Sequence, residues 1–352
     1  MVRILIAIGE KTFTNPFVST LSEGLRARGL QVVCSSDEFW HNWGDYDIIH
    51  IQWPEQLLKE ERGATPEDFE NILIQQRAAG KKVVSTCHNL APHYAKGRVS
   101  DRAYDIAYRN SDCMIHLGEY SLDLCKTQYP NVRHALIPHH VYDKRYSLSP
   151  QSRDEAVSAF SLDAKYRYIL CLGYCRSDEE RRLLKNMSDS LRKEKIRILA
   201  PQMDMPLPYP NPVKRLREYL RFYRNKIRYR GVICDGKFVP DESLSALYKA
   251  CDLAFVQHLH LLNSGNVPMA FLMGKVCVGP DVGNVGPFLR STGNPVFSAE
   301  DLQGTLDAVH SGLALAGEGK GESNREYALQ NFSTDRIVGM YVDLYSDLML
   351  KH

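Results

Sequence analysis

Residues 259–289, LHLLNSGNVPMAFLMGKVCVGPDVGNVGPFL, place a short polar segment between two apolar ones. An apolar run at residues 252–259 leads into Asn263-Ser264-Gly265-Asn266, and a second apolar stretch begins at Val267-Pro268. Proline is favoured in the first turn of a helix, so this order predicts a buried strand, a polar turn and a helix. The apolar run that follows, residues 276–280, predicts the next strand.

The same alternation of strand and helix patterns extends through the rest of the chain. Strand-like runs occur near residues 2–8, 31–35, 47–53, 81–89, 113–118 and 134–140, and again near 166–175, 195–201 and 231–240. Between these runs, Asn15-Pro16, Thr65-Pro66 and Asp241 are predicted to begin helices. Such alternation predicts an α/β protein with parallel sheets that helices cover on both faces. A polar, proline-containing segment at residues 142–161 separates the two halves. We therefore predict two Rossmann-like doubly wound domains, 1–150 and 151–330, that face a central cleft.

Composition excludes several classes of protein. The 352 residues include 44 basic and 42 acidic ones, a net charge of +2, so no overall field favours nucleic acid. Nine cysteines are scattered without a CxxC pair or a zinc-binding spacing, which indicates reduced thiols. The first apolar run is too short for a signal peptide or a membrane span. These features together predict a cytoplasmic protein.

The polar segment has the chemistry of an anion site. Unpaired backbone N–H groups and the helix dipole favour a phosphate at a helix N-terminus. Gly265 lets a ligand approach the backbone, and the Ser264 hydroxyl can donate a further hydrogen bond. The alternative is an ordinary helix cap. A second glycine-rich turn, Pro280–Gly286, predicts either another close backbone approach or a simple turn.

Several runs together resemble one known family in matching order. They are residues 15–29 (NPFVSTLSEGLRARG), 85–93 (STCHNLAPH), 135–146 (ALIPHHVYDKRY), 168–184 (YILCLGYCRSDEERRLL), 238–289 and 331–349 (NFSTDRIVGMYVDLYSDLM). The series resembles GT-B glycosyltransferases, particularly retaining family 4 enzymes of bacterial polysaccharide biosynthesis. The resemblance implies a hexosyltransferase that moves a sugar from a nucleotide-diphosphate sugar to a glycan or lipid-linked acceptor. It also implies donor binding by residues 151–330 and a closing helix, 331–352, that crosses back to the first domain.

The resemblance assigns the donor site in the second half of the chain. Arg176, three residues after Gly173, matches the phosphate-binding Arg of the family. The Lys that usually follows is absent, so Arg181 or Arg182 takes its place. The polar segment Asn263–Asn266 completes the donor site. The sequence contains no DxD motif, so we expect no metal and no other cofactor; the alternative for Arg176 is a solvated loop charge.

The first half supplies the other predicted site residues. In similar enzymes a His in the position of His88 contacts the donor sugar, so His88, Asn89 and Arg176 are the predicted catalytic residues. The alternative for His88 is a satisfied polar group at a strand end. Predicted acceptor-side residues are Glu10, Lys11, Trp53 and His93. A core position for Trp53 and an ordinary loop position for His93 are equally open.

One departure from the family keeps other functions open. Many family 4 enzymes carry two Glu residues eight apart, the second of which binds ribose; the matching positions here are Leu261 and Met269. A nucleotide-sugar epimerase and a non-catalytic nucleotide-sugar- or glycan-binding partner are therefore alternatives. If the enzyme inverts configuration, Glu55 or His88 is the expected base. A dehydrogenase is disfavoured because no GxGxxG follows the first strand.

Residues 213–230, VKRLREYLRFYRNKIRYR, form a basic run with interleaved aromatic residues and a single acidic one, Glu218. Three interpretations of Lys214–Arg230 are open. The first is peripheral contact with an anionic membrane at the inner face of the cell, and the second is binding to a phosphate-bearing glycan or RNA. The third is a solvated helical face. We predict no nucleic-acid function from one basic run.

Overall fold

The computed structural model describes residues 2–9, 15–90, 98–206 and 209–350. Glu10, Lys11 and His93 lie outside the described residues, so their predicted roles stay predictions. The chain divides into two compact units. Unit 1 comprises Met1–Arg145 with Asn331–His352, and unit 2 comprises Tyr146–Gln330. The sequence predicts boundaries after residues 150 and 330.

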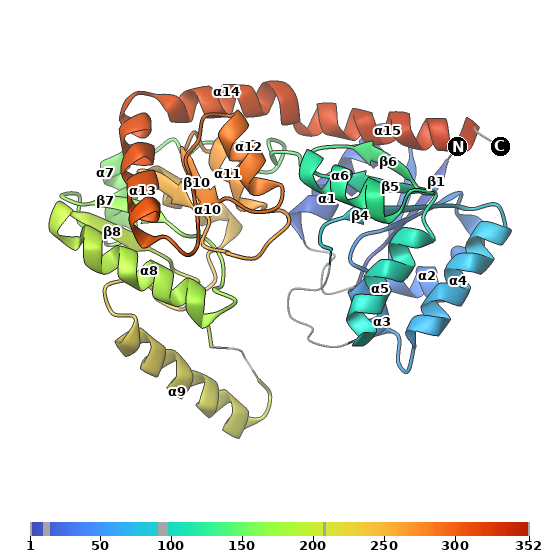
Figure 1. Ribbon diagram of the computed structural model, residues 1–352, viewed down its shortest axis with the longest axis horizontal. Coiled ribbons are helices and arrows are strands. Elements are labelled where there is room, and N and C mark those ends of the chain that lie inside the picture. Colours follow the sequence, from blue (N-terminus) through green and yellow to red (C-terminus); the bar gives the residue numbers. More distant parts are fainter. Residues whose placement is uncertain (1, 10–14, 91–97, 207–208, 351–352) are drawn as a thin grey trace. The chain divides into compact units, whose positions relative to one another are not determined.

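Unit 1 is built on a six-stranded parallel sheet of order β2-β1-β3-β4-β5-β6 (Figure 1). The strands are β1 (Arg3–Ala7), β2 (Gln31–Cys34), β3 (Ile48–Ile51), β4 (Lys82–Cys87), β5 (Cys113–His116) and β6 (Arg133–Leu136). The helices are α1 (Pro16–Ala27), α2 (Ser36–His41), α3 (Pro54–Glu60), α4 (Pro66–Ala78), α5 (Arg98–Arg109), α6 (Glu119–Gln128) and α15 (Thr334–Leu350), with a 3-10 turn η2 (Trp43–Asp45). β1, β3, β4 and β5 are almost completely buried, as expected for strands covered on both faces.

Unit 2 contains a second parallel sheet, of order β11-β10-β9-β7-β8. The strands are β7 (Arg167–Leu170), β8 (Ile196–Leu199), β9 (Leu253–Phe255), β10 (Cys277–Pro280) and β11 (Val296–Phe297). The helices are α7 (Arg153–Ala159), α8 (Asp178–Leu191), α9 (Pro212–Arg228), α10 (Asp241–Ala250), α11 (Asn266–Leu272), α12 (Val285–Ser291), α13 (Leu302–Gly317) and α14 (Lys320–Phe332), with a 3-10 turn η3 (Arg192–Glu194). The predicted fold class, two Rossmann-like doubly wound α/β domains, is confirmed.

Local capping signals explain several of these boundaries. The Asn15 side chain accepts a hydrogen bond from the Phe17 backbone N–H at 2.9 Å, and Pro16 occupies the first helical position of α1. Thr65 and Asp68 form a capping box at the start of α4. Both helix starts follow the sequence prediction because a side-chain acceptor and a proline satisfy the first turn locally.

The predicted strand at residues 231–240 is wrong. Among these residues only Ile233 pairs with the sheet, as an isolated bridge to Leu199. Gly231 and Gly236 have φ of 104° and 72°, left-handed conformations that take the backbone out of a strand. The next helix begins at Asp241 as expected, but its N-cap is Pro240 and no side chain caps it.

The C-terminal helix α15 packs against α1 within unit 1 (Figure 1). The Thr334 backbone N–H and hydroxyl both donate to the Asp143 carboxylate at 2.7 Å. Near its other end, the Tyr345 hydroxyl lies 2.7 Å from Nδ1 of His50 on β3. The last helix is thus joined to the sheet of unit 1 by a buried polar contact.

Unit 1 contains several buried histidines whose protonation is suppressed. Burial lowers the pKa of His50 and His116 from 6.5 to about 3 and that of His140 to about 4. The pKa of His88 lies well below 6.5, first because of burial and then because of nearby His139 and His50. These side chains stay neutral in the folded protein at pH 7.

We predict that the free energy of unfolding falls as pH drops below about 6.5. The unfolded chain then binds protons that the folded chain does not, so each such His removes up to about 1.4 kcal/mol per pH unit. Thermal unfolding between about pH 8 and pH 5.5, where most carboxylates stay ionised, measures the effect. A melting temperature that stays constant over this window would contradict the prediction.

Candidate functional site

The strand order of unit 2 reverses between β7 and β9. In open parallel sheets, ligands bind beyond the carboxyl ends of the strands at such a switch point. The loop after β7, residues 171–177, carries Gly173 and Arg176, and the segment after β9, residues 256–265, carries the polar segment. The predicted donor residues therefore follow the two strands that flank the switch point.

Hydrogen bonds join these two loops directly. Nε2 of Gln257 donates to the carbonyls of Leu172 and Gly173 at 3.1 and 3.2 Å, and Nδ2 of Asn266 donates to the Leu172 carbonyl at 2.8 Å. Gly173 has φ of 102°, and a Cβ there would lie 3.6 Å from Nε2 of His258. Glycine is needed at this position because side chains rarely adopt that backbone conformation.

The polar segment forms the predicted turn into α11. The Ser264 hydroxyl accepts from the Asn266 backbone N–H at 3.3 Å, and the Asn263 side chain accepts from the Asn284 amide at 2.8 Å. Gly265 is the N-cap of α11 with φ of −67°, a conformation open to any residue. Backbone conformation therefore does not require glycine here, and the anion-binding role of the segment stays a prediction.

The second glycine-rich turn has a structural explanation. Gly283 has φ of 53°, and a Cβ there would lie 2.5 Å from the Leu261 carbonyl oxygen. The backbone N–H of Asn284 donates to the Leu262 carbonyl at 2.8 Å. The preceding loop of the same chain, at Leu261 and Leu262, thus makes the close approach to the backbone of this turn.

A buried carboxylate, Glu180, supports the Arg176 loop. It accepts from the Arg176 backbone N–H at 2.6 Å and lies 3.4 Å from Nδ1 of His258 and from the Leu259 backbone N–H. Burial alone would raise the pKa of Glu180, but the contacts with His258 and Arg176 outweigh it and lower that pKa. Sequence reasoning missed Glu180, Gln257 and His258. Glu180 could have been found from the sequence, because it stands three residues after Ser177, which is the spacing of a capping box.

The predicted arginines differ in their surroundings. Arg176 is half-buried. Arg181 is buried and bonds to neighbouring residues of its own segment. Its Nη1 donates to the Asp178 carboxylate at 3.1 Å, and its Nη2 donates to the Cys175 carbonyl at 2.8 Å. Arg182 is exposed. Donor binding by Arg176 and Arg181 stays a prediction.

Leu261 and Met269, the positions that the sequence resemblance matches to the Glu pair of family 4 enzymes, are both buried.

In unit 1, a chain of hydrogen bonds runs from the end of β4 to the C-terminal helix. Nε2 of His88 lies 2.7 Å from Oε1 of Gln52, Nε2 of Gln52 lies 3.1 Å from Nε2 of His50, and His50 contacts Tyr345. With this orientation of the Gln52 amide, His88 donates from Nε2 and its Nδ1 carries no proton. Burial keeps the imidazole neutral, as its lowered pKa indicates.

The His88 ring is held by aromatic neighbours. Trp53 stacks on it with ring centroids 4.2 Å apart, and Phe17 meets it edge-on at 4.9 Å. Asn89 is buried beside it; its side-chain amide donates to the Tyr104 hydroxyl at 3.4 Å, and its backbone carbonyl accepts from the Tyr108 hydroxyl at 2.5 Å. The structure therefore brings together His88, Asn89 and Trp53, with one face of Trp53 covered by His88.

Glu55, at the start of α3, is a buried carboxylate near this group. Its Oε2 has no hydrogen-bond partner among the described residues. Burial, followed by the charge of Glu55, raises the pKa of the nearby Tyr104 hydroxyl. The role of Glu55 as a general base stays a prediction.

A cluster of potential metal ligands lies elsewhere in unit 1. Cys87, His116 and Cys125 place their ligand atoms within 4.8 Å of one another, and all three side chains are buried. A hydrogen bond with Cys125, together with burial, raises the pKa of the Cys87 thiol well above 9.0. The same hydrogen bond lowers the pKa of the Cys125 thiol.

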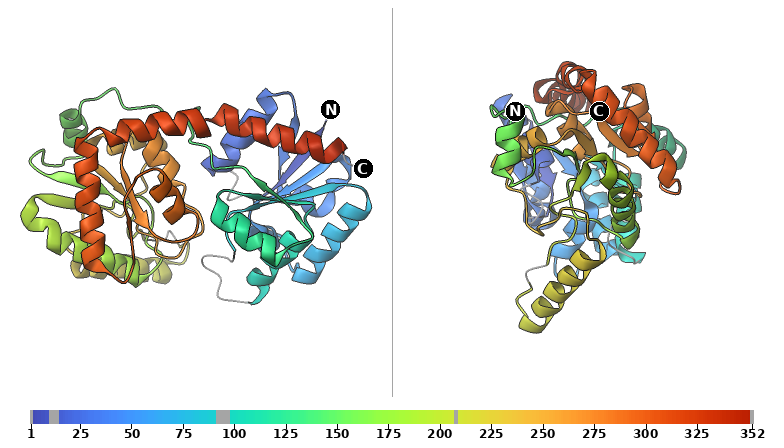
Figure 2. Two further views of the ribbon diagram at one scale, coloured as in Figure 1. Left: turned by 45° about the horizontal axis from the view of Figure 1, so that its top comes forward. Right: turned by 90° about the vertical axis from the view of Figure 1, so that its left-hand side faces the viewer.

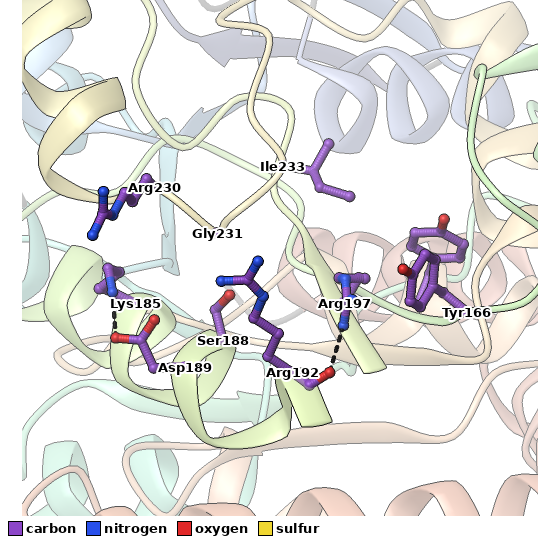
Figure 3. A pocket seen from close by; sticks show the side chains of 10 residues that line it. Tyr166, Lys185, Ser188, Asp189, Arg192, Arg197, Arg230, Gly231 and Ile233 are labelled. Carbon is purple, nitrogen blue, oxygen red and sulfur yellow. Dashed lines mark hydrogen bonds and ion pairs between the residues drawn. The ribbon is translucent and has the colours of Figure 1, made fainter. Parts of the chain in front are cut away.

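Unit 2 also contains a basic cavity of about 850 Å³ (Figure 3). Its lining residues are Tyr166, Tyr168, Lys185, Ser188, Asp189, Arg192, Arg197, Arg230, Gly231 and Ile233. Lys185 pairs with Asp189, and Arg197 donates to the Arg192 carbonyl at 3.0 Å. Tyr166 and Arg197 lie at the amino ends of β7 and β8, so this cavity is separate from the switch-point loops.

No helix in the described part of the chain is both long enough and apolar enough to cross a membrane.

Comparison with known proteins identifies the fold. No protein-family model matches the chain, and no curated protein matches it.

Among solved structures, sucrose-phosphate synthase from Thermosynechococcus elongatus matches with a TM-score of 0.72 at 14% identity, over 100% of both chains. Anabaena HepE in complex with UDP-glucose matches with a TM-score of 0.70 at 13% identity, over 99% of this chain and 100% of the other. A protein described as a UDP-N-acetylglucosamine 2-epimerase, from Listeria monocytogenes, matches with a TM-score of 0.63 at 10% identity, over 100% and 97%. The chain therefore has the GT-B fold of glycosyltransferases.

We predict that Glu180→Ala destabilises the protein by about 1–3 kcal/mol, because it leaves the backbone N–H groups of Arg176 and of the buried Leu259 without their acceptor. Glu179→Ala, at the exposed neighbouring position, is the matched control and is expected to change stability by less than about 0.5 kcal/mol. Urea unfolding measures both variants. Equal effects at the two positions would contradict the supporting role of Glu180.

Proposed function

We propose that this protein transfers a sugar from a nucleotide-diphosphate sugar to a glycan or lipid-linked acceptor. One observation carries the proposal: the polar loops that follow β7 and β9 meet at the switch point of unit 2. The fold adds support, because HepE shares it over nearly the whole chain and has been solved with UDP-glucose.

The chemistry of transfer accounts for the residues at this edge of the sheet. Breaking the anomeric C–O bond leaves negative charge on the departing diphosphate, which positioned donors and cations stabilise. In our proposal, Arg176 supplies the cation, and Ser264, Gly265 and Asn266 supply donors at the start of α11. Glu180 and Gln257 hold the two loops in place. The proposed stabilisation uses these groups and no metal.

Unit 1 supplies a neutral, oriented imidazole. The His88–Gln52 hydrogen bond sets the ring so that Nε2 carries the proton, and aromatic contacts limit its rotation. Such a ring suits contact with an uncharged sugar hydroxyl. We propose retention of configuration and a role in polysaccharide biosynthesis, both on the resemblance to family 4.

A second candidate is nucleotide-sugar epimerisation, which the likeness to the Listeria protein favours. An epimerase acts on the same donor class but needs no acceptor. The outcome of donor turnover therefore separates the two functions.

We predict slow hydrolysis of one donor from a panel of UDP-, GDP- and ADP-sugars, with release of its nucleotide and of the sugar in its original configuration at C2. Arg176→Ala lowers the rate by roughly 10²-fold, because one charge-stabilising group is lost. Arg192→Ala is the control, since it removes a cation from the separate basic cavity and leaves the rate unchanged. Chromatography of nucleotide and sugar products measures both.

Release of the C2 epimer would instead establish the epimerase. Tight donor binding by calorimetry without turnover, in the presence of panels of glycan and lipid-linked acceptors, would favour the non-catalytic binding partner. Failure to bind any donor would refute the assignment of the switch-point loops.

The stereochemical course makes a separate prediction. A retaining enzyme needs no base on the acceptor, so Glu55→Gln keeps most of the activity and proton NMR shows a product with the anomeric configuration of the donor. Loss of 10²-fold or more in Glu55→Gln, with an inverted product, would assign Glu55 as a general base and overturn retention.

A further inference from the structure

Helix α9 is attached to unit 2 by one face. Phe222 and Asn225 are its buried residues, and Nδ2 of Asn225 donates to the buried Asp204 carboxylate at 2.6 Å. Arg221 pairs with Asp204 and, at 2.8 Å, with Glu218. The helix is therefore anchored through polar contacts and one aromatic ring.

The opposite face of α9 is apolar and exposed to solvent. Its large side chains are between 47% and 75% exposed: Val213, Leu216, Tyr219, Leu220, Tyr223 and Ile227. At about 100° per residue they occupy one third of the helix circumference, centred opposite Phe222 and Asn225. Monomeric proteins rarely leave such a contiguous apolar stripe uncovered, so the stripe indicates an interaction surface.

Cations border this stripe on both sides. Arg217, Arg224 and Arg228 follow one edge, and Arg215 and Lys226 follow the other; all five are exposed. The single acidic residue of α9, Glu218, lies on the anchored side and pairs with Arg221. The exposed face thus combines apolar and tyrosine side chains with positive charge alone.

We propose that α9 is an interfacial helix that docks unit 2 on an anionic lipid bilayer. The apolar stripe would enter the boundary between headgroups and acyl chains, while the flanking cations contact lipid phosphates. Figure 1 and the right-hand view of Figure 2 show α9 outside the helices that cover the sheet of unit 2.

Charge decides between a bilayer and other occupants. If two copies paired through this stripe, Arg and Lys flanks would face each other without a carboxylate partner, which is unfavourable. A nucleic acid would satisfy the cations but would leave the aliphatic side chains exposed. An anionic bilayer satisfies both groups at once.

This inference rests on α9 alone and is independent of the proposed transferase activity. If both hold, the helix brings the enzyme to a surface where lipid-linked acceptors reside.

The test is co-sedimentation of the full chain with vesicles of phosphatidylcholine, with and without 30% phosphatidylglycerol. The expected result is binding to the anionic vesicles, weakened by salt and at least tenfold weaker to the neutral ones. The variant Leu216→Ser/Leu220→Ser/Ile227→Ser loses at least tenfold in binding. Ile74→Ser, at an exposed apolar position on α4, is the matched control and binds like the wild type.

Circular dichroism and thermal unfolding, compared with the wild type, test whether the triple variant is folded. Absence of binding to anionic vesicles, or equal binding by the wild type and the triple variant, would overturn the proposal. So would a stable dimer in light scattering that the triple variant abolishes, because the stripe would then bind a second copy.

Discussion

The parallel pairing of β7 with β9 is the constraint on which the candidate donor site depends. It places the ends of two strands more than 80 residues apart in sequence side by side, as in the pairing of Leu170 with Ala254. Because both strands run in the same direction, their following loops leave the sheet at the same edge. Gln257 and Asn266 then bond to the backbone after β7, and the buried Glu180 carboxylate holds the Arg176 backbone beside them.

Unit 1 is organised around a row of hydrogen-bonded neutral side chains in an aromatic and apolar environment. His50, Gln52 and His88 each form a hydrogen bond with a neighbouring side chain, so this row can be buried without an unpaired charge. The same burial that orients His88 makes its protonation costly. Orientation of the imidazole and sensitivity of unit 1 to acid are thus two consequences of one arrangement.

Helix α9 differs from the other amphipathic helices because its apolar stripe faces away from the body of its unit. Its periodicity is that of an ordinary surface helix. Only the anchoring of Phe222, Asn225 and Arg221 shows which face remains outside. The pattern left three interpretations open, and side-chain exposure is the property that favours a lipid surface among them.

Local chemistry predicted much of the fold. Asn15-Pro16 and Thr65-Pro66 marked helix starts because caps act within one turn. Buried apolar runs marked the strands of both sheets except β11, the two-residue strand Val296–Phe297, which the sequence analysis missed. The strand expected at residues 231–240 does not form, because Gly231 and Gly236 adopt left-handed conformations that direct the backbone out of a strand. Glu180 and His258 were missed because their contact joins loops that are distant in sequence. By itself, the sequence determined the alternation of elements and the polar turn before α11. Only the tertiary structure decided which loops meet, which arginine is half-buried and which face of α9 is exposed, because these depend on contacts between residues far apart in the chain.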